Sequence, residues 1–154
     1  MAEVKSISTP PRIVYDHTIG MAAMQGRGTY YPMDIAIGNN DRIYVLNRSS
    51  DGDKRAVGIR VMDFHEDFYG TFGSYGKNDG QLVWPVGVAI DSGQQLFISD
   101  ENLHRITVLS TDGQFIATWG KYGVADGQLN GPAGLAFDSN NDLVVADQGN
   151  CRIQ

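Results

Sequence analysis

The sequence has little of several features that would narrow its class at once. A single cysteine, Cys151, excludes an internal disulfide and is typical of a reducing compartment. No apolar run is long enough to cross a bilayer, so we expect no transmembrane helix. Residues 1–12 lack the apolar core of a signal peptide. We therefore expect a flexible N-terminal arm over residues 1–12 and a cytoplasmic location.

Basic residues are scarce over most of the chain. Residues 1–60 hold eight Lys and Arg against six Asp and Glu, whereas residues 61–154 hold four against twelve. Nonspecific binding to nucleic acid depends on Lys and Arg that neutralise phosphates. The net charge of −6 therefore argues against a nucleic-acid partner. Residues 42–60 are basic enough to keep RNA binding open as a minor alternative.

Three segments of the chain align with one another without gaps. In each, a proline is followed fifteen residues later by Asn or Asp and preceded by a glycine at twelve residues. The segments are PMDIAIGNNDRIYVLN (Pro32–Asn47), PVGVAIDSGQQLFISD (Pro85–Asp100) and PAGLAFDSNNDLVVAD (Pro132–Asp147), and the glycines are Gly20, Gly73 and Gly120. The prolines lie 53 and 47 residues apart, and a period of this size indicates a propeller or a solenoid.

Each unit has the pattern of four short antiparallel strands. Apolar residues alternate with small or polar ones, as half-buried strands require. Gly, Pro and Asn interrupt every candidate helix. Small residues on one side of the first strand suit the crowded innermost strand of a propeller blade. Four-stranded units at this period predict an all-β propeller.

The motifs also resemble one known repeat. The strands GVAID and GLAFD, the strands LFISD and LVVAD, the stretch ENLHRITVLSTDGQFIATWG and the connector GKYGVADGQLNGP are similar to the NHL repeat. The resemblance covers about residues 13–154 and is looser in the first unit, where Asn47 replaces Asp and the turn before Arg60 is eight residues longer. It implies about three four-stranded blades of a six-bladed NHL-type β-propeller. We expect a leading outer strand at residues 13–20, blades at 32–73 and 85–120, and a partial blade at 132–154.

Three blades leave sheet faces and edges exposed. The chain could belong to a longer propeller, pair with a second copy, or be held by a larger complex. A protein partner or a second copy is therefore expected to complete the propeller. The resemblance implies a binding or scaffold module that mediates protein–protein interaction as a subunit of a larger assembly.

Aromatic and basic residues are expected together at one rim, on the face that carries the connectors between blades. Amphipathic rings suit interaction hot spots, and an extended charged turn suits recognition. Rings that cover gaps between blades, and a solvated loop, are the structural alternatives. The partner-binding candidates are Tyr30, Tyr31, Arg48, Lys54, Arg55 and Trp84.

Two further patterns concern charged residues on strands. Asp34 stands where the other units have Gly87 and Gly134, so we expect a carboxylate near the central channel that binds a cation or polar ligand, or meets water. Two Asp–Arg pairs share a spacing of five across a turn, and we expect them to be structural ion pairs. These pairs are Asp100 with Arg105 and Asp147 with Arg152.

The enzymatic alternative is a lyase or lactonase with a metal in the central channel. The three histidines, His17, His65 and His104, occupy different positions of the repeat, so no shared metal site is predicted. The resemblance implies that lyases of this type bind zinc through histidines directly after the first-strand proline. This chain has Met33, Val86 and Ala133 there. We therefore expect no metal, no cofactor and no catalytic residue, and favour a binding module over an enzyme.

Overall fold

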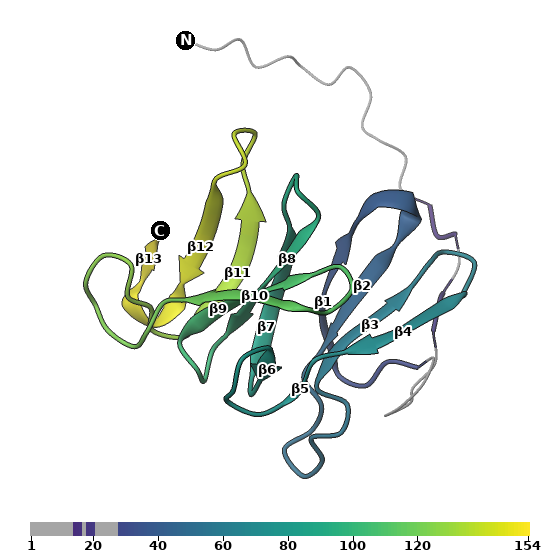
Figure 1. The fold of residues 1–154 in the computed structure, drawn as a ribbon, viewed down its shortest axis with the longest axis horizontal. Coiled ribbons are helices and arrows are strands. Elements are labelled where there is room, and N and C mark those ends of the chain that lie inside the picture. The colour runs from purple at the N-terminus through teal and green to yellow at the C-terminus, as the bar shows by residue number, and fades with distance from the viewer. Residues whose placement is uncertain (1–13, 17, 21–27) are drawn as a thin grey trace.

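Antiparallel sheets stand side by side like the blades of a propeller (Figure 1). The structure is a computed structural model that describes residues 14–16, 18–20 and 28–154. Helical structure in these residues is limited to two single 3₁₀ turns, η1 (Asn39–Asp41) and η2 (Gln148–Asn150). The prediction of an all-β propeller is confirmed.

Two sheets have four strands, and a third has three. Blade 1 consists of β1 (Pro32–Ile37), β2 (Ile43–Asn47), β3 (Gly58–Met62) and β4 (Phe68–Phe72). Blade 2 consists of β7 (Pro85–Ile90), β8 (Gln95–Asp100), β9 (Arg105–Ser110) and β10 (Phe115–Trp119). Blade 3 consists of β11 (Pro132–Phe137), β12 (Leu143–Asp147) and β13 (Arg152–Ile153). A short parallel pair, β5 (Ser74–Tyr75) and β6 (Gln81–Leu82), lies in the connector between blades 1 and 2.

The antiparallel order places the loops on two opposite faces of the propeller. The face that carries the β2–β3 loop, the segment before β1 and the connectors between blades is called the connector face, and comprises residues 28–31, 48–57, 73–84, 101–104, 120–131 and 148–151. The other face carries the remaining tight turns and is called the hairpin face, comprising residues 38–42, 63–67, 91–94, 111–114 and 138–142. In Figure 1 the β1–β2, β7–β8 and β11–β12 turns point upward, and the connector between blades 1 and 2 lies at the bottom.

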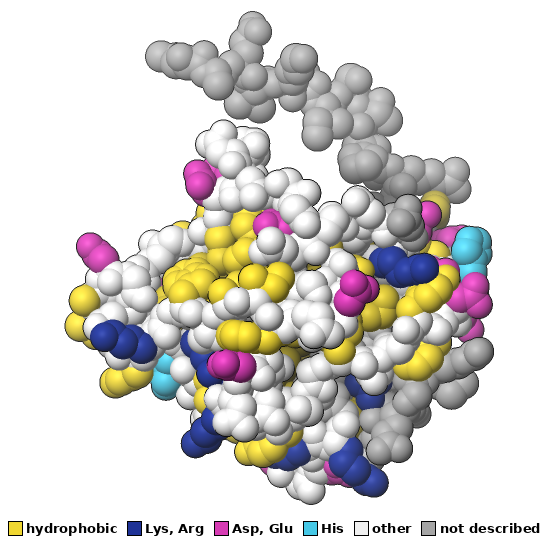
Figure 2. Space-filling view, in the orientation of Figure 1, with side chains coloured by type: hydrophobic (Ala, Val, Ile, Leu, Met, Phe, Trp, Pro, Cys, Tyr) yellow, Lys and Arg dark blue, Asp and Glu magenta, His cyan; other side chains and the backbone are white. Residues whose placement is uncertain are grey.

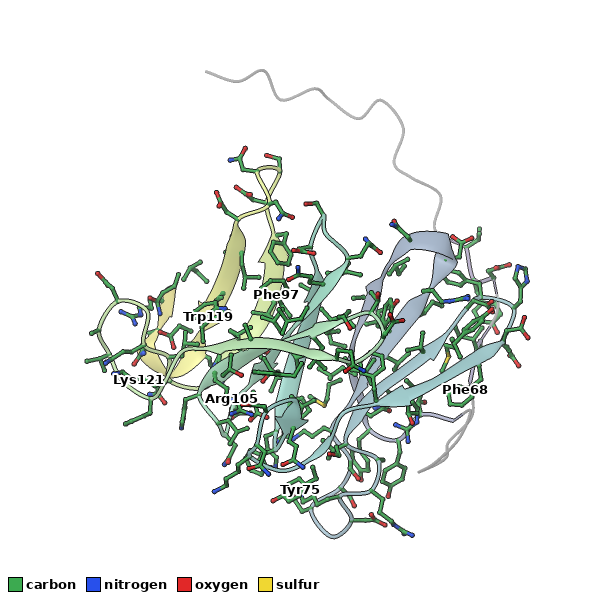
Figure 3. The ribbon with its side chains drawn as sticks, viewed as in Figure 1. Phe68, Tyr75, Phe97, Arg105, Trp119 and Lys121 are labelled. Atoms are coloured by element: carbon green, nitrogen blue, oxygen red, sulfur yellow. The ribbon has the colours of Figure 1, made fainter. Side chains whose placement is uncertain are left out.

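The core lies between the blades. One face of blade 1, with Tyr44, Leu46 and Ile59, packs against Leu96 and other apolar residues of blade 2 in a single buried cluster. A second cluster joins blade 2 to blade 3, where the Phe97 and Phe137 rings meet edge to face at 4.9 Å. Figure 3 shows Phe97 in this position between the two blades. Period-two alternation therefore buries both faces of the middle blade.

Hydrogen bonds between the innermost strands add to this packing. The Asp34 carboxylate on β1 accepts the Val88 N–H of β7 at 2.9 Å. At the next interface the Ser99 hydroxyl donates to the Ala133 carbonyl at 2.6 Å and accepts the Gly87 N–H at 2.8 Å. A Cβ at Gly87 would lie 2.6 Å from the Ala133 oxygen, so the close approach of the two blades requires glycine here.

The outer faces of the end blades remain apolar and open. On blade 1, Ile35 and Ile37 are 55% and 53% exposed, and Ile43, Val45 and Met62 lie beside them under partial cover from Ile19. These residues alternate with those that face blade 2, as strand geometry requires.

Two features differ from the sequence-based expectation. The expected outer strand at residues 13–20 has no strand among its described residues, 14–16 and 18–20. Of these residues, Ile19 packs on the face of blade 1, against Ile43, Val45 and Met62. The expected arm, residues 1–12, lies outside the described residues.

The second difference concerns the register of β3. The repeat predicts that Arg60 takes the place of Arg105. In the structure Arg105 pairs with Asp100, and the residue that pairs with the equivalent Asn47 is Gly58. Arg60 lies two residues further along β3, buried and opposite Val45. Strand periodicity does not determine the length of the β2–β3 loop. An insertion in this loop can therefore shift the sequence alignment of β3 by two residues, which leaves each side chain on the same face of the strand.

Among the described residues no helix is long or apolar enough to span a membrane.

Candidate functional site

The connector between two blades is held by an arginine at the start of the third strand. Arg105 donates to the carbonyls of Lys77, Asn78 and Gln81 at 3.0–3.2 Å. Arg152 makes the same contacts 47 residues later, to Val124, Ala125 and Gln128, at 2.7–2.9 Å. Charged donors make strong hydrogen bonds, so each connector has a defined position on its blade.

A buried acidic residue holds the other end of each connector. The Asp100 carboxylate is fully buried and accepts N–H groups from Val83, Trp84, Asn102 and Leu103. Asp147 accepts the Asn130 N–H at 2.7 Å in the equivalent place. In the first unit Asn47 accepts the Tyr30 N–H at 2.9 Å. Asn47, which replaces Asp in the first unit, therefore still accepts a backbone N–H from the segment before the first strand.

The two predicted Asp–Arg pairs differ in geometry. Arg152 Nε lies 2.8 Å from Asp147 Oδ2, which is a direct ion pair. Asp100 and Arg105 are also opposite each other in the register, but no ion pair joins them in the described part of the chain. Both arginines hold a connector, and only the second also neutralises its carboxylate.

Exposed tyrosines lie on these anchored connectors. Tyr75 and Tyr122 occupy the same position of the two connectors, and they are 45% and 68% exposed. Tyr31, before β1, is 57% exposed and packs edge to face on Tyr30 at 5.0 Å. In Figure 3, Tyr75 lies at the lower edge of the molecule, below Arg105. The connector face thus presents aromatic rings on well-anchored loops.

The predicted basic candidates lie beside these rings. The Arg48 guanidinium lies 4.3 Å from the Trp84 ring and 3.7 Å from the Glu101 carboxylate, which joins the long loop of blade 1 to blade 2. Lys54 lies 5.7 Å from the Tyr75 ring and 3.6 Å from Asp51. Figure 2 shows most Lys and Arg side chains along the lower and left margins, on the connector side of the view.

Arg55 forms an ion pair with Asp53 within the same loop. The hydrogen bond from the Arg55 side chain, together with its backbone N–H, lowers the pKa of Asp53 to about 2. Each basic candidate therefore already has a carboxylate neighbour. Such a loop presents a mixed surface of paired charges and rings rather than a uniform positive patch for phosphates.

The structure brings most of the predicted partner-binding residues together. Tyr30, Tyr31, Arg48 and Trp84 form one connected group, because the Arg48 N–H also donates to the Tyr31 carbonyl at 3.1 Å. Tyr75 and Tyr122 were missed by the sequence analysis. Their signal was available, because they recur in SYGKNDGQL and KYGVADGQL at the repeat period.

Asp34 lies on the innermost strand, and both of its oxygens have backbone partners. Oδ2 accepts from Val88 and Oδ1 from Ile35, each at 2.9 Å. The carboxylate thus links blades 1 and 2. Its predicted contact with a channel ligand stays a prediction.

The histidines do not converge in the described part of the chain. His104 is in the β8–β9 turn on the connector face, where Nδ1 accepts the Gly131 N–H at 3.0 Å. His65 is in the β3–β4 turn on the opposite face, and His17 lies outside the described residues. Among residues 14–16, 18–20 and 28–154, no three His, Cys, Asp or Glu side chains are grouped as a metal ion would require.

The family comparison agrees with the repeat geometry. The model of the NHL repeat matches residues 129–154. The match begins at Leu129, which is buried beneath the connector, and includes β11, β12 and β13. The predicted resemblance to NHL-repeat propellers is thereby confirmed. No curated protein matches the sequence closely enough to be counted as a relative.

Solved structures share the fold at low identity. Virginiamycin B lyase from Staphylococcus aureus aligns with a TM-score of 0.56 and 13% identity over 79% of this chain and 36% of the lyase. A gluconolactonase from Xanthomonas campestris aligns with a TM-score of 0.55 and 18% identity over 78% of this chain and 36% of the enzyme. A chain of a nidogen/laminin complex aligns with a TM-score of 0.53 and 19% identity over 80% of this chain and 46% of that one. The chain thus spans little more than a third of the length of the first structures that it matches.

Proposed function

We propose that this chain is the protein-binding part of an NHL-type β-propeller that acts as a scaffold within a larger assembly. The connector face would be the docking surface. The observation that carries the proposal is the set of exposed tyrosines, Tyr31, Tyr75 and Tyr122. Tyr75 and Tyr122 lie on connectors held by Asp and Arg contacts, and the segment before β1 that carries Tyr31 is held by Asn47.

Rigid aromatic side chains favour binding because little conformational entropy is lost when they are covered. Tyr122 is supported by the His104 ring at 4.8 Å, and its neighbour Val124 is 77% exposed. Tyrosine offers apolar area and a hydroxyl donor, which suits the centre of a protein interface.

The charges of this face favour a protein over a nucleic acid. Arg48, Lys54 and Arg55 each lie within 4 Å of a carboxylate. A phosphate would have to compete with these acids, whereas a folded partner can contact rings and paired charges together. We therefore infer a partner that brings apolar side chains with a polar margin.

Affinity purification with paired variants tests the proposal. Tyr75→Ser with Tyr122→Ser removes two rings from the connector face. Phe115→Ser with Ile116→Ser is the matched control, since these exposed residues lie on the outer strand β10. We expect a stoichiometric partner with the wild type and the control, and its loss with the tyrosine variant. An identical set of partners for all three proteins, or none for any, would contradict the proposal.

A further inference from the structure

A cavity of about 410 Å³ opens between blades 1 and 2 on the hairpin face, away from the proposed docking surface. Its polar lining consists of Arg42, Tyr44, Tyr69, Thr71, Thr111 and Asp112. Val61 and Phe72 add apolar wall. A cavity of this size with a few convergent polar groups has the dimensions of a small-molecule site.

Four polar residues of blade 1 in and beside this cavity depart from the repeat. The structural alignment places Gln95, Phe97, Ser110 and Ile116 of blade 2 where blade 1 has Arg42, Tyr44, Asp63 and Tyr69. Blade 2 folds without these groups, so the fold alone does not require them. Their convergence on one cavity instead points to a ligand.

The backbone has the same geometry at Tyr69 of blade 1 and at the equivalent Ile116 of blade 2. A β-bulge leaves Tyr69 unpaired between Phe68 and Gly70, and the same bulge leaves Ile116 unpaired in blade 2. Bulges turn a side chain away from the regular pleat. The repeat thus supplies the position, and blade 1 places a phenol there instead of an alkyl chain.

Arg42 is held in place by two partners. Its guanidinium lies 3.1 Å from the centre of the Tyr69 ring, and the Tyr69 hydroxyl donates to Asp63 Oδ2 at 2.7 Å. The distance from Arg42 to Asp63 is 3.8 Å, longer than a hydrogen bond. The cation is therefore oriented, and a ligand carboxylate in the cavity would share it with Asp63.

Asp112 comes from the opposite wall, in the β9–β10 turn of blade 2. Its carboxylate forms no hydrogen bond or ion pair within the described residues. The turn is seated on blade 1, because Gly113 has a φ of +81° and a Cβ there would lie 2.5 Å from Phe72. Figure 1 shows the turn reaching across to blade 1. The turn that carries the exposed Asp112 is thus fixed relative to blade 1.

The Tyr44 hydroxyl lies within range of both charges. Burial raises the pKa of Tyr44, a hydrogen bond with Thr111 and the charge of Arg42 lower it, and the charge of Asp112 raises it. A cation, an anion and a buried hydroxyl therefore face the same space. An anionic ligand would meet the like charges of Asp63 and Asp112, and a cationic ligand would meet that of Arg42. A small zwitterion would instead pair with both Arg42 and Asp112.

We propose that this cavity binds a free α-amino acid. Its carboxylate contacts Arg42, its ammonium contacts Asp112, and an aliphatic side chain lies against Val61 and Phe72. This site is independent of the connector face, so either proposal can fail without the other.

Isothermal titration of the chain with three related probes tests this site. L-Leucine carries both charges, L-leucinamide lacks the carboxylate, and N-acetyl-L-leucine lacks the ammonium. We expect saturable binding of L-leucine, and affinity at least about tenfold weaker for each of the other two. Equal binding of leucinamide or acetyl-leucine, or no binding of L-leucine up to about 10 mM, would overturn the proposal.

Variants taken from the repeat separate binding from folding. Arg42→Gln and Tyr69→Ile introduce the residues that blade 2 carries, and Asp112→Asn removes only the charge. Each is expected to weaken L-leucine binding about tenfold or more while the thermal unfolding midpoint changes little. Asp79→Asn and Lys121→Gln, on the connector face, are the matched controls and should bind like the wild type. Unchanged affinity in Arg42→Gln or Asp112→Asn would refute the site.

Discussion

Burying a carboxylate costs free energy unless its oxygens accept hydrogen bonds. The buried Asp100 accepts them from the backbone of the connector face and so holds that backbone in place. Its two oxygens receive N–H groups from both sides of the connector face, at Val83 and Trp84 and at Asn102 and Leu103. Asn47 and Asp147 each accept one backbone N–H at the equivalent place of the other units. At the residue scale, the repeat therefore keeps an acceptor for backbone N–H groups at this position.

Asp100→Ala should lower the free energy of unfolding by about 3 kcal/mol, since one buried and three part-buried N–H groups lose their acceptor. Asp100→Asn should cost less, because Asn47 shows that one amide oxygen can serve this position. Urea unfolding followed by tryptophan fluorescence measures both. Asp79→Ala, at an exposed connector position, should stay within about 0.5 kcal/mol of the wild type. Equal stability of Asp100→Ala and Asp79→Ala would contradict the anchoring role.

Asp147 makes stability depend on pH. Burial alone would raise its pKa, but hydrogen bonds from the Asn130 N–H and from the side chains of Asn150, Arg152 and Gln154 outweigh burial and hold the pKa below its ordinary value of 3.8. A lowered pKa stabilises the fold above the unfolded-state pKa, and this contribution disappears as the pH falls through the folded-state pKa.

We therefore expect the free energy of unfolding to fall between about pH 5 and pH 2, and to fall less steeply in Asp147→Asn. Chemical unfolding at a series of pH values measures the difference between the two proteins. That difference should shrink as the pH is lowered, because the wild-type carboxylate becomes protonated. A slope in Asp147→Asn as steep as in the wild type would remove Asp147 as the cause.

The connectors are the elements that carry the proposed docking surface, and an arginine donates to three carbonyls of each. Because Arg105 and Arg152 make equivalent contacts 47 residues apart, one connector is an internal reference for the other. The β9–β10 turn plays the same role on the hairpin face, where its contact with blade 1 builds the cavity. At the element scale, short loops obtain their order from charged or close contacts with a neighbouring strand.

Arg105→Met should raise amide hydrogen exchange in residues 76–82 by about tenfold or more, because three carbonyl contacts are lost. Residues 123–128, held by Arg152, should exchange as in the wild type. Hydrogen exchange followed by mass spectrometry resolves the two connectors. Equal exchange of residues 76–82 in both proteins would mean that the β5–β6 pairing alone orders this connector.

Gly113→Ala should destabilise the fold by about 2 kcal/mol or more, because the left-handed backbone and the contact with Phe72 both exclude a Cβ. It should also weaken L-leucine binding, since the turn that carries Asp112 is displaced. Gly52→Ala is the matched control, because a Cβ at Gly52 would meet nothing within 4 Å. Thermal unfolding and titration report the two effects, and a Gly113→Ala protein as stable as Gly52→Ala would disprove the close contact.

At the scale of the whole molecule, blade 2 packs against a neighbouring blade on each face, and among the described residues the outward face of blade 1 stays partly exposed. In blade 2, Val88 and Ile90 pack against blade 1. Ile35 and Ile37 occupy the equivalent strand positions of blade 1 and point away from blade 2. The open surface of blade 1 thus has the pattern of half of a blade–blade interface. Contiguous apolar surfaces of this kind promote association in water.

We expect the isolated chain to associate in a concentration-dependent manner, and Ile35→Lys with Ile37→Lys to reduce association. Charged residues on an apolar sheet face oppose its burial. Phe115→Lys with Ile116→Lys adds the same charge to the outer strand β10 and is the control. Sedimentation velocity distinguishes the three proteins. A monomeric wild type, or equal loss of association in both variants, would show that the open face of blade 1 is not the contact.

The repeated sequence was sufficient to predict the blades, because alternation and turn residues act locally. The fixed intervals from Pro to Asp and from Gly to Pro correspond to the strands and connectors of blades 2 and 3. The expected match of Arg60 to Arg105 was wrong, because the sequence of a longer loop does not indicate at which residue strand pairing begins again. Pairing with β2 begins again at Gly58. The expected outer strand at residues 13–20 needs the edge of another strand to pair with, and the sequence of residues 13–20 does not indicate which strand that is.

The candidate sites were harder to predict because they lie between repeats. The aromatic and basic candidates of the connector face were identified from their places in single units, but the contact of Arg48 with Trp84 and Glu101 joins two blades. The cavity between Arg42 and Asp112 combines residues seventy positions apart in sequence. Neither residue departs strongly enough from its surroundings to be noticed alone.

The sequence by itself determined that this chain forms four-stranded units with small residues on the inner strand, since side-chain periodicity and glycine turns are properties of neighbouring residues. Only the tertiary structure decided which units touch, how closely the blades approach, and which charges share a cavity. Those outcomes depend on packing between distant segments, where a single Cβ at Gly113 or Gly87 changes what can fit.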